Sequence, residues 1–246
     1  GVSITVAVPT QLRRMLDSPR FDPARLSSLR LVVYGAAPTG IPLIRRAMGV
    51  LPCGLYQGYG LSEATTNLTG LLPEDHQLDT LDERLSTAGR PVVGVELSIR
   101  DENGVALAAD EPGEIWVRTD KVMAGYWGNP AATTEAIVDG WLRTGDIGRL
   151  GRDGYLSIVD RVKDMLISGG VNVYPSEIEA VLRQWPGLTD VAVVGRPDDE
   201  WGEVPIAFIS VEPGMHVDEA TVKAFCRERL AGLKVPREVR VIDEFP

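Results

Sequence analysis

A seven-residue segment from Gln57 to Glu63 collects side chains that are suited to binding a nucleotide. It holds an aromatic ring (Tyr59), two glycines, a hydroxyl (Ser62) and a carboxylate. The ring can stack on a base, the hydroxyl can donate to a phosphate oxygen, and the carboxylate can hold a hydrated Mg²⁺. The same residues also fit a tight turn with a buried tyrosine and a solvated Ser-Glu pair, so both interpretations stay open for this segment alone.

Other polar and small residues further along the chain are weaker candidates when each is taken alone. Asp146 is a carboxylate at an expected turn, where an Asx turn or a strand-end cap is the alternative to a ribose ligand. Arg161 and Lys163 are by default surface cations. Gly35-Ala36-Ala37 is by default the close packing of a loop on a helix, and the pair Gly169-Gly170 indicates little by itself.

The segment from Asp153 to Glu179 is the part of the chain around which the rest is organised. An Asp-Gly turn opens it, a short alternating strand follows, and the polar run Asp160-Arg161-Val162-Lys163-Asp164 separates two apolar runs. A second short strand then leads to Pro175, which is suited to the first position of a helix. We expect a joint between two bodies, residues 1–160 and residues 161–246.

The hydrophobic pattern predicts a mixed α/β (α+β) fold. The first 60 or so residues read as a β-α-β sheet whose loops share one edge, and a region of short strands punctuated by Gly and Pro follows, which indicates an antiparallel sheet or a distorted antiparallel β-barrel. The residues after Pro175 read as a small C-terminal α+β lid domain. The expected strands are 4–8, 29–34, 55–59, 92–99, 114–117, 147–150, 155–159, 191–194, 206–211 and 239–242, with helices near 12–16 (capped by Thr10), after Thr39, after Pro175 and over 217–230 (capped by Asp218).

Composition and charge exclude several classes of protein. The net charge is −10 and the positive charges are scattered, which disfavours a nucleic-acid or acidic-membrane partner. Cys53 and Cys226 lie far apart without a CxxC pair, which argues against a disulfide framework or a zinc site and for a reducing cytoplasm. Neither a signal peptide nor a membrane-spanning apolar run is present, so we expect a soluble, cytoplasmic protein. His76 and His216 point to no site.

Taken together and in order, the segments resemble the adenylate-forming superfamily, which includes acyl- and aryl-CoA synthetases, firefly luciferase and peptide-synthetase adenylation domains. YGLSEAT at 59–65 is similar to the Tyr-Gly-x-Thr/Ser-Glu motif of that family. GYWGNP at 125–130, GWLRTGDIG at 140–148 and DGYLSIVDRVKDMLISGGVNVYPSEIE at 153–179 resemble its other signatures. The resemblance covers roughly residues 2–246 and is closest to the CoA ligases.

The resemblance implies an ATP-dependent acid–thiol ligase. A carboxylate attacks the α-phosphate of Mg·ATP to give an acyl-adenylate and pyrophosphate, the small domain swings about the hinge, and a thiol, normally that of coenzyme A, attacks the activated carbonyl. The implied partners are a small carboxylic acid, ATP/AMP, Mg²⁺ and coenzyme A, with homo-oligomerisation left open. By position, Gly35, Ala36 and Ala37 border the adenine, Tyr59 stacks on it, and Gln57, Gly58 and Gly60 are further cofactor-binding residues. Ser62 contacts phosphate, Glu63 ligates Mg²⁺, and Lys163 is the hinge; these three are the catalytic candidates. Asp146 accepts from the ribose, Arg161 reaches the ribose or phosphate, and Ser168, Gly169 and Gly170 line the pantetheine tunnel.

Two positions refine the expected subtype within this resemblance. Gly60 stands where enzymes for very small acids resemble one another in carrying tryptophan. Its small volume favours a medium-chain, long-chain or aryl acid, unless the turn alone requires the glycine. Lys163 and Val171 differ from the aspartate and arginine that are typical of peptide-synthetase adenylation domains.

The chain also departs from the family pattern. It holds no Ser/Thr/Gly-rich loop followed by a lysine, and it stops at Pro246, where the family's Gly-Lys pair is expected. We therefore expect the C-terminal portion of a ligase, inactive or very weak in adenylate formation by itself, with a partly exposed apolar face on its first strands. An adenylation domain that loads a carrier-protein thiol, and a non-catalytic nucleotide-binding fragment, stay open as alternatives.

Overall fold

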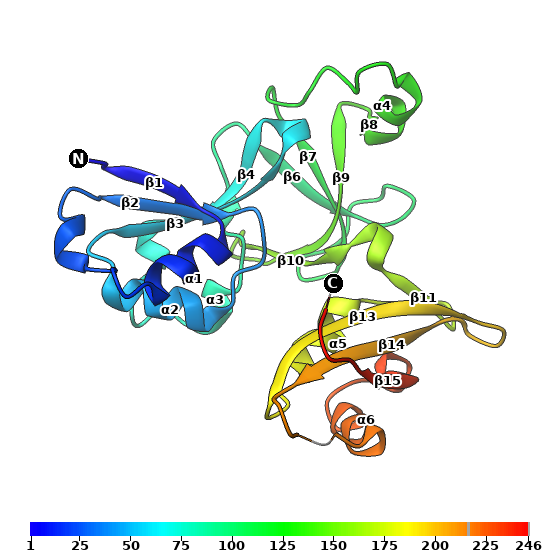
Figure 1. The fold of residues 1–246 in the computed structure, drawn as a ribbon. Helices are drawn as coiled ribbons and strands as arrows, with labels where there is room; N and C mark the ends of the chain where they lie inside the picture. The colour runs from blue at the N-terminus through cyan, green and yellow to red at the C-terminus, as the bar shows by residue number, and fades with distance from the viewer. Residues whose placement is uncertain (216, 246) are drawn as a thin grey trace. The chain divides into compact units, whose positions relative to one another are not determined.

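The chain folds into two units, which we describe from a computed structural model of residues 1–215 and 217–245, without the side chain of Thr66 (Figure 1). His216 and Pro246 lie outside the described residues. The first unit comprises residues 1–144 and 148–158, and the second comprises residues 145–147 and the chain from Val159 onward. The predicted division after Asp160 stays a prediction, and in the structure the chain passes into the second unit after Ile158.

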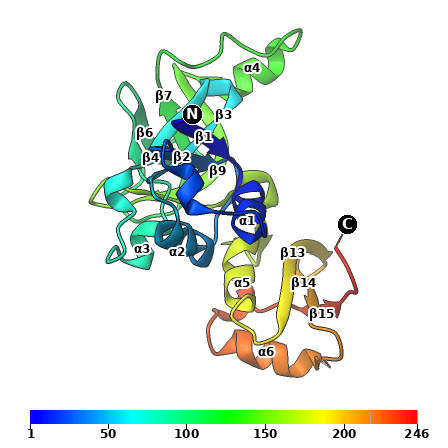
Figure 2. The same ribbon diagram turned by 60° about the vertical axis from the view of Figure 1, so that its left-hand side comes forward.

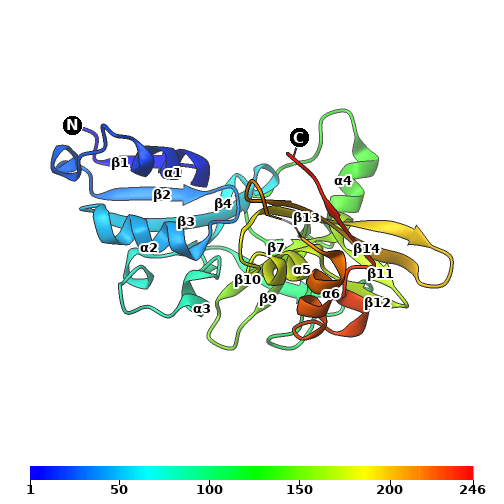
Figure 3. The same ribbon diagram turned by 60° about the horizontal axis from the view of Figure 1, so that its bottom comes forward.

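The first sheet is built from the apolar runs at the start of the chain. Its order is β1-β2-β3-β4-β5; β1 to β3 are parallel, whereas β4 pairs antiparallel with both β3 and β5 (Figure 3). The predicted β-α-β arrangement is therefore confirmed. The elements are β1 (Ile4–Ala7), α1 (Pro9–Asp17), β2 (Leu31–Gly35), α2 (Ile41–Val50), β3 (Gly54–Leu61), β4 (Thr66–Leu71), α3 (Asp82–Leu85) and β5 (Arg90–Pro91).

Helices α1 and α2 pack against one hydrophobic cluster with β2 and β3. Leu12 of α1, Ile44 of α2 and Val32 of β2 are 1% exposed or less and belong to this cluster. The opposite situation holds on β1, where Ile4 and Val6 are 51% and 75% exposed. The partly exposed apolar face expected on the first strands is thus present.

Both predicted N-caps in this region are wrong. Helix α1 is preceded by Val8 and not by Thr10, because Pro9 occupies the first helical position, which suits a residue without an N–H. The side chain of Gln11 accepts a hydrogen bond from the Val8 N–H at 3.1 Å. Helix α2 is preceded by Gly40 instead of Thr39 and has no side-chain cap.

A second, five-stranded sheet has the order β10-β9-β7-β6, with β8 paired to β9. The β6–β7 and β8–β9 pairs are antiparallel. Within the described residues the sheet is open, so the predicted antiparallel sheet is confirmed and the barrel is not formed. Its elements are β6 (Glu96–Arg100), β7 (Gly113–Arg118), α4 (Pro130–Ala136), β8 (Ile137–Val138), β9 (Trp141–Leu150) and β10 (Leu156–Arg161).

Stacked arginine and tryptophan side chains stabilise one face of this sheet. The guanidinium of Arg100 lies 4.6 Å from the ring centroid of Trp116 and 4.5 Å from that of Trp141. Glu114 is 8% exposed and accepts hydrogen bonds from the Trp116 indole and from Arg143 Nε, both at 3.0 Å. The buried carboxylate is therefore charge-paired, which a buried charge requires.

The second unit is a sheet covered by two helices (Figure 2). Its strand order is β12-β11-β14-β13, and β15 pairs in parallel with β14. Asp218 caps the last helix by accepting from the Thr221 N–H at 3.1 Å, as predicted. The elements are β11 (Leu166–Ser168), β12 (Val171–Val173), α5 (Pro175–Leu182), β13 (Leu188–Asp198), β14 (Gly202–Val211), α6 (Glu219–Arg227) and β15 (Glu238–Val241). No described helix is both long enough and apolar enough to cross a membrane.

Candidate functional site

At the carboxyl end of β2 the chain passes too close to β3 for Gly35 to carry a side chain. Gly35 lies opposite Gly58 of β3, and a Cβ on Gly35 would lie 2.2 Å from the Gly58 carbonyl oxygen. Ala36 follows with φ 66°, a left-handed conformation that is unusual for a residue with a side chain. Ala36 and Ala37 are exposed. This edge of the sheet therefore offers a strained, open turn of small residues.

Strand β3 extends two residues beyond its expected end at Tyr59, to Leu61. Gln57, Gly58, Tyr59 and Gly60 all belong to β3, and the register against β4 shifts between Tyr59 and Gly60. The break comes instead at Ser62, so the break expected at Gly60 is corrected. A β-bulge re-aims the side chains around it, which is a common arrangement beside functional sites.

The turn after β3 presents Ser62 and Glu63. It is a single 3-10 turn, Ser62–Ala64, closed by Thr65 at φ 51°. Ser62 is exposed, Glu63 is half-buried, and Tyr59 is half-buried against the second sheet's core. Tyr59 is thus packed on one side without being buried.

Glu63 has a partner that the sequence did not indicate. The hydroxyl of Tyr126 donates to Glu63 Oε1 at 2.9 Å, and the N–H of Met123 donates to the Glu63 carbonyl at 2.7 Å. The hydrogen bond to Glu63 raises the pKa of Tyr126. Among the residues described, no arginine, lysine or histidine forms an ion pair with Glu63. The only available sequence signal was that Tyr126 and Glu63 each lie in a family motif.

The residues around Glu63 fit a magnesium ion that is shared with a ligand. Nowhere in the described chain do three or more His, Cys, Asp or Glu side chains gather into a metal cage. Mg²⁺ keeps several waters and is usually held by one or two carboxylates together with substrate phosphates. The half-buried carboxylate of Glu63, which directly follows the exposed Ser62 in the chain, matches this pattern.

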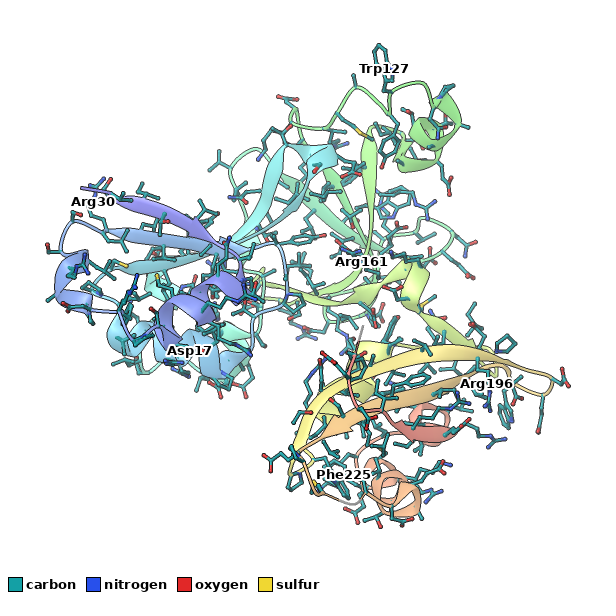
Figure 4. The ribbon with its side chains drawn as sticks, in the orientation of Figure 1. Asp17, Arg30, Trp127, Arg161, Arg196 and Phe225 are labelled. Carbon is teal, nitrogen blue, oxygen red and sulfur yellow. The ribbon has the colours of Figure 1, made fainter. Side chains whose placement is uncertain are left out.

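In the second unit the structure brings Asp146 and Arg161 together. Arg161, labelled in Figure 4, has its Nε 3.5 Å from Asp146 Oδ1, and the side-chain exposures of the two residues are 63% and 17%. Asp146 lies within β9 and not at a turn, which corrects that prediction. Gly145, at φ 72°, bends the strand immediately before it. Tyr59 belongs to the other unit, so a common adenosine site for the three residues stays a prediction.

The polar run from Asp160 to Asp164 begins at the end of β10, and Asp160 binds it to the start of helix α5. Lys163 is exposed in a 3-10 turn, Val162–Asp164. The Asp160 carboxylate accepts from the Ser176 N–H at 3.0 Å and from the Arg161 N–H at 2.8 Å. The Ser176 hydroxyl donates to the Val159 carbonyl. Asp160 thereby satisfies an N–H at the start of α5, which has no side-chain cap of its own.

Gly169 and Gly170 form the two-residue turn between β11 and β12. Their φ angles of 57° and 76° fit a type I′ hairpin, which explains both glycines structurally. The Gly169 N–H donates to the Trp201 carbonyl at 2.8 Å, and a Cβ on Gly169 would lie 2.9 Å from the Trp201 ring. Both glycines are exposed, whereas Ser168 is 1% exposed, so its side chain is not at the surface.

Gln57 takes part in a buried polar network with Tyr34 and His76, which no sequence pattern indicated. The Tyr34 hydroxyl lies 2.8 Å from His76 Nε2 and donates to Gln57 Oε1 at 3.2 Å. His76 Nδ1 lies 2.8 Å from the Leu72 carbonyl oxygen, so this nitrogen carries a proton. Burial lowers the pKa of His76 and raises that of Tyr34.

Acidification is expected to destabilise the first unit through His76. Because burial lowers the folded-state pKa of His76, the unfolded chain binds the proton more readily. This contribution is complete above the unfolded value of about 6.5 and is lost as the pH falls from there through the lower folded-state pKa. Urea unfolding at pH 7.5 and pH 5.5 measures the difference, which His76→Gln should reduce. An equal pH dependence in the variant would contradict the prediction.

Comparison with known proteins identifies the family. The model of the AMP-binding enzyme family matches residues 1–127, which is more than half of the chain, and the model of the AMP-binding enzyme C-terminal domain matches residues 177–246. The chain belongs to the AMP-binding enzyme family. The predicted membership in the adenylate-forming superfamily is thereby confirmed.

The relatives of this member of the AMP-binding enzyme family include CoA ligases and an amide bond synthetase. A feruloyl-CoA synthase from Amycolatopsis sp is 40% identical over 247 residues, covering 100% of this chain and 49% of the relative. The structure of the amide bond synthetase McbA from Marinactinospora thermotolerans has a TM-score of 0.86 and 37% identity, over 100% of this chain and 49% of that one. O-succinylbenzoate coenzyme A synthetase from Bacillus subtilis, in complex with ATP and magnesium ion, has a TM-score of 0.82 and 33% identity, over 100% and 49%. The chain spans about half the length of the curated relatives that it matches.

Proposed function

We propose that this protein is an AMP-forming acid–thiol ligase that activates a carboxylic acid with ATP and transfers the acyl group to coenzyme A. The observation that carries the proposal is the turn after β3. It carries Ser62 and Glu63 as consecutive residues, and the Tyr126 hydroxyl holds the Glu63 carboxylate, which no described cation neutralises. Membership of the AMP-binding enzyme family and the CoA-ligase relatives support the same activity.

The proposed reaction has two balanced steps. A carboxylate oxygen of the acid attacks the α-phosphorus of ATP, the bond to the β-phosphate oxygen breaks, and pyrophosphate leaves. A thiolate then attacks the acyl carbonyl, the mixed anhydride bond breaks, and AMP leaves. Both steps expel an anionic phosphate, so they need charge stabilisation more than covalent help from the protein.

The residues of the first unit are assigned to the base and the phosphates. Tyr59 stacks on the adenine, which the small residues after Gly35 border. Ser62 donates to a phosphate oxygen. Glu63 would hold Mg²⁺, which supplies charge neutralisation on the phosphates when it is bound.

The residues of the second unit are assigned to the ribose and the thiol arm. Asp146 accepts from the ribose hydroxyls, and Arg161 contributes positive charge beside it. The proposed pivot is Lys163. Gly169 and Gly170 expose backbone without side chains along the proposed pantetheine path, while Ser168 contributes only its main chain there because its side chain is buried.

Replacement of Asp146 by asparagine is expected to weaken AMP binding by about tenfold or more. A hydrogen bond to a charged group contributes about 1.5–3 kcal/mol, and the amide removes that charge. Calorimetry with AMP on the complete encoded polypeptide measures the change. Asp17→Asn is the matched control, because Asp17 also faces an arginine, Arg46, but on the surface of the first unit. Equal affinities for wild type and Asp146→Asn would remove Asp146 from the site.

The acceptor is decided by offering several nucleophiles in one assay. Coenzyme A is the expected acceptor, a phosphopantetheinyl carrier protein is the runner-up, and an amine is included because the McbA relative is an amide bond synthetase. ATP–pyrophosphate exchange with a panel of medium-chain, long-chain and aryl acids tests the first step. Binding of AMP without exchange for any acid would favour a non-catalytic nucleotide-binding protein.

A further inference from the structure

We propose that Tyr126 is a positioning residue that fixes the Glu63 carboxylate for Mg²⁺, and this inference rests on the proposed function. The contact joins residues that are far apart in sequence within the first unit. Tyr126 stands between β7 and α4, whereas Glu63 lies on the turn after β3. The hydroxyl–carboxylate distance is 2.9 Å.

The contact is one of four hydrogen bonds that join the turn after β3 and the start of β4 to residues 121–126. The Met123 N–H donates to the Glu63 carbonyl at 2.7 Å, and the Thr65 hydroxyl donates to the Lys121 carbonyl at 2.9 Å. The Lys121 ammonium donates to the Asn67 carbonyl, also at 2.9 Å. The three bonds that end on main-chain carbonyls therefore set the position of the turn, and the Tyr126 hydroxyl sets the direction of the carboxylate.

Tyr126 is itself held in place by its neighbours. Its N–H donates to the Thr133 hydroxyl at 2.9 Å, and that hydroxyl donates to the Asn129 carbonyl at 3.0 Å. A Cβ on Gly125 would lie 2.8 Å from the Thr133 methyl group, so the close approach of this segment to α4 requires glycine. The next residue, Trp127, is fully exposed and points away from the ribbon (Figure 4). Tyr126 is 40% exposed, but unlike its neighbour it directs its hydroxyl to Glu63.

A fixed carboxylate binds a cation better than a mobile one. Ordering a glutamate side chain costs conformational free energy, and Tyr126 orders the Glu63 side chain before the metal arrives. Only Oε1 receives the Tyr126 hydroxyl. Partners that orient a metal ligand typically change metal affinity by about 10- to 100-fold when they are removed.

The test uses Tyr126→Phe in the complete encoded polypeptide. We expect the Mg²⁺ concentration at half-saturation of ATP binding to rise about tenfold, while AMP binding without metal changes less than about twofold. Binding of Mn²⁺ in the presence of ATP, followed by electron paramagnetic resonance, gives the same comparison without catalysis. Tyr155→Phe is the matched control, because it also removes a hydroxyl–carboxylate bond, to Asp75 Oδ1 at 2.7 Å, away from Glu63.

The outcomes separate this inference from the proposed function. A metal dependence that is unchanged in Tyr126→Phe, or shifted equally in Tyr155→Phe, overturns the positioning role alone. A loss of metal-free AMP binding equal to the loss of Mg·ATP binding also overturns it, because general damage to the fold would explain both. A wild-type protein without any Mg²⁺-dependent binding of ATP overturns the proposed function and this inference with it.

Discussion

Replacing Gly89 with alanine is expected to destabilise the first unit by about 2–5 kcal/mol. Gly89 has φ 81°, and an added Cβ would lie 1.9 Å from the Gly70 carbonyl oxygen and 2.2 Å from the Leu71 nitrogen. Main-chain atoms of a strand cannot move away cheaply. Overpacking costs about 1–3 kcal/mol, and a left-handed conformation costs an alanine about 1–2 kcal/mol more.

The position of Gly89 explains why the effect should be large. Its carbonyl accepts from the Leu156 N–H of β10 at 2.8 Å, and the preceding Ala88 N–H donates to the Leu156 carbonyl at 2.7 Å. Gly89 therefore lies between β4 of the first sheet and β10 of the second. Any shift that relieves the clash with Gly70 must lengthen these bonds to Leu156.

Gly94→Ala separates the clash from the backbone strain. Gly94 has nearly the same φ, 79°, but no atom within 4 Å of the position of an added Cβ. Its replacement should cost only the strain, about 1–2 kcal/mol. Urea unfolding followed by circular dichroism measures both variants, and hydrogen exchange at the amides of β3 identifies the unit that unfolds. Equal losses in the two variants would show that the close approach at Gly89 does not matter.

In the complete encoded polypeptide, replacing Glu63 with glutamine is expected to reduce ATP–pyrophosphate exchange by about 100-fold or more. Glutamine keeps an oxygen that can accept from the Tyr126 hydroxyl, so the turn should keep its shape. The substitution removes the negative charge, and a hard cation such as Mg²⁺ prefers ionised oxygen ligands. Losses of this size are typical when a single preorganised electrostatic group is removed from an active site.

The control for this variant is a carboxylate of the same unit outside the site. Glu96 pairs with Arg118 on the surface, and exposed ion pairs of this kind contribute less than about 1 kcal/mol. Glu96→Gln should therefore leave both exchange and AMP binding near wild-type values. Exchange in Glu63→Gln within a few-fold of wild type would exclude Glu63 as a metal ligand.

The elements that carry long apolar patterns were predictable from the sequence. The apolar runs at Leu29–Tyr34 and Leu55–Tyr59 predicted strands, which the structure has as β2 and β3, and the stripe containing Ile178 and Leu182 predicted α5. In each case the hydrophobic period alone separates strand from helix. The caps Thr10 and Thr39 were wrong because a neighbouring proline, which the period does not register, placed the start of each helix elsewhere.

The missed features of the site depend on contacts across the chain. Asp146 was expected at a turn because Gly145 precedes it, but hydrogen bonding to neighbouring strands keeps both residues within β9. Tyr126 and Glu63 carry no opposite charges and are separated in sequence by the four strands β4 to β7, so no local pattern joins them. His76 shows the same limit, because only burial beside Tyr34 gives this histidine a role.

Two hydrogen bonds of Ser176, to the Asp160 carboxylate and to the Val159 carbonyl, hold the start of α5 against the end of β10. Lys163 lies between Asp160 and Ser176, so a rotation of its backbone that carries α5 away from β10 has to release the Asp160 carboxylate from the Ser176 N–H. The same rotation separates the Ser176 hydroxyl from Val159. A pivot at Lys163, as proposed above, would have to break both bonds of Ser176, and these bonds would therefore oppose it.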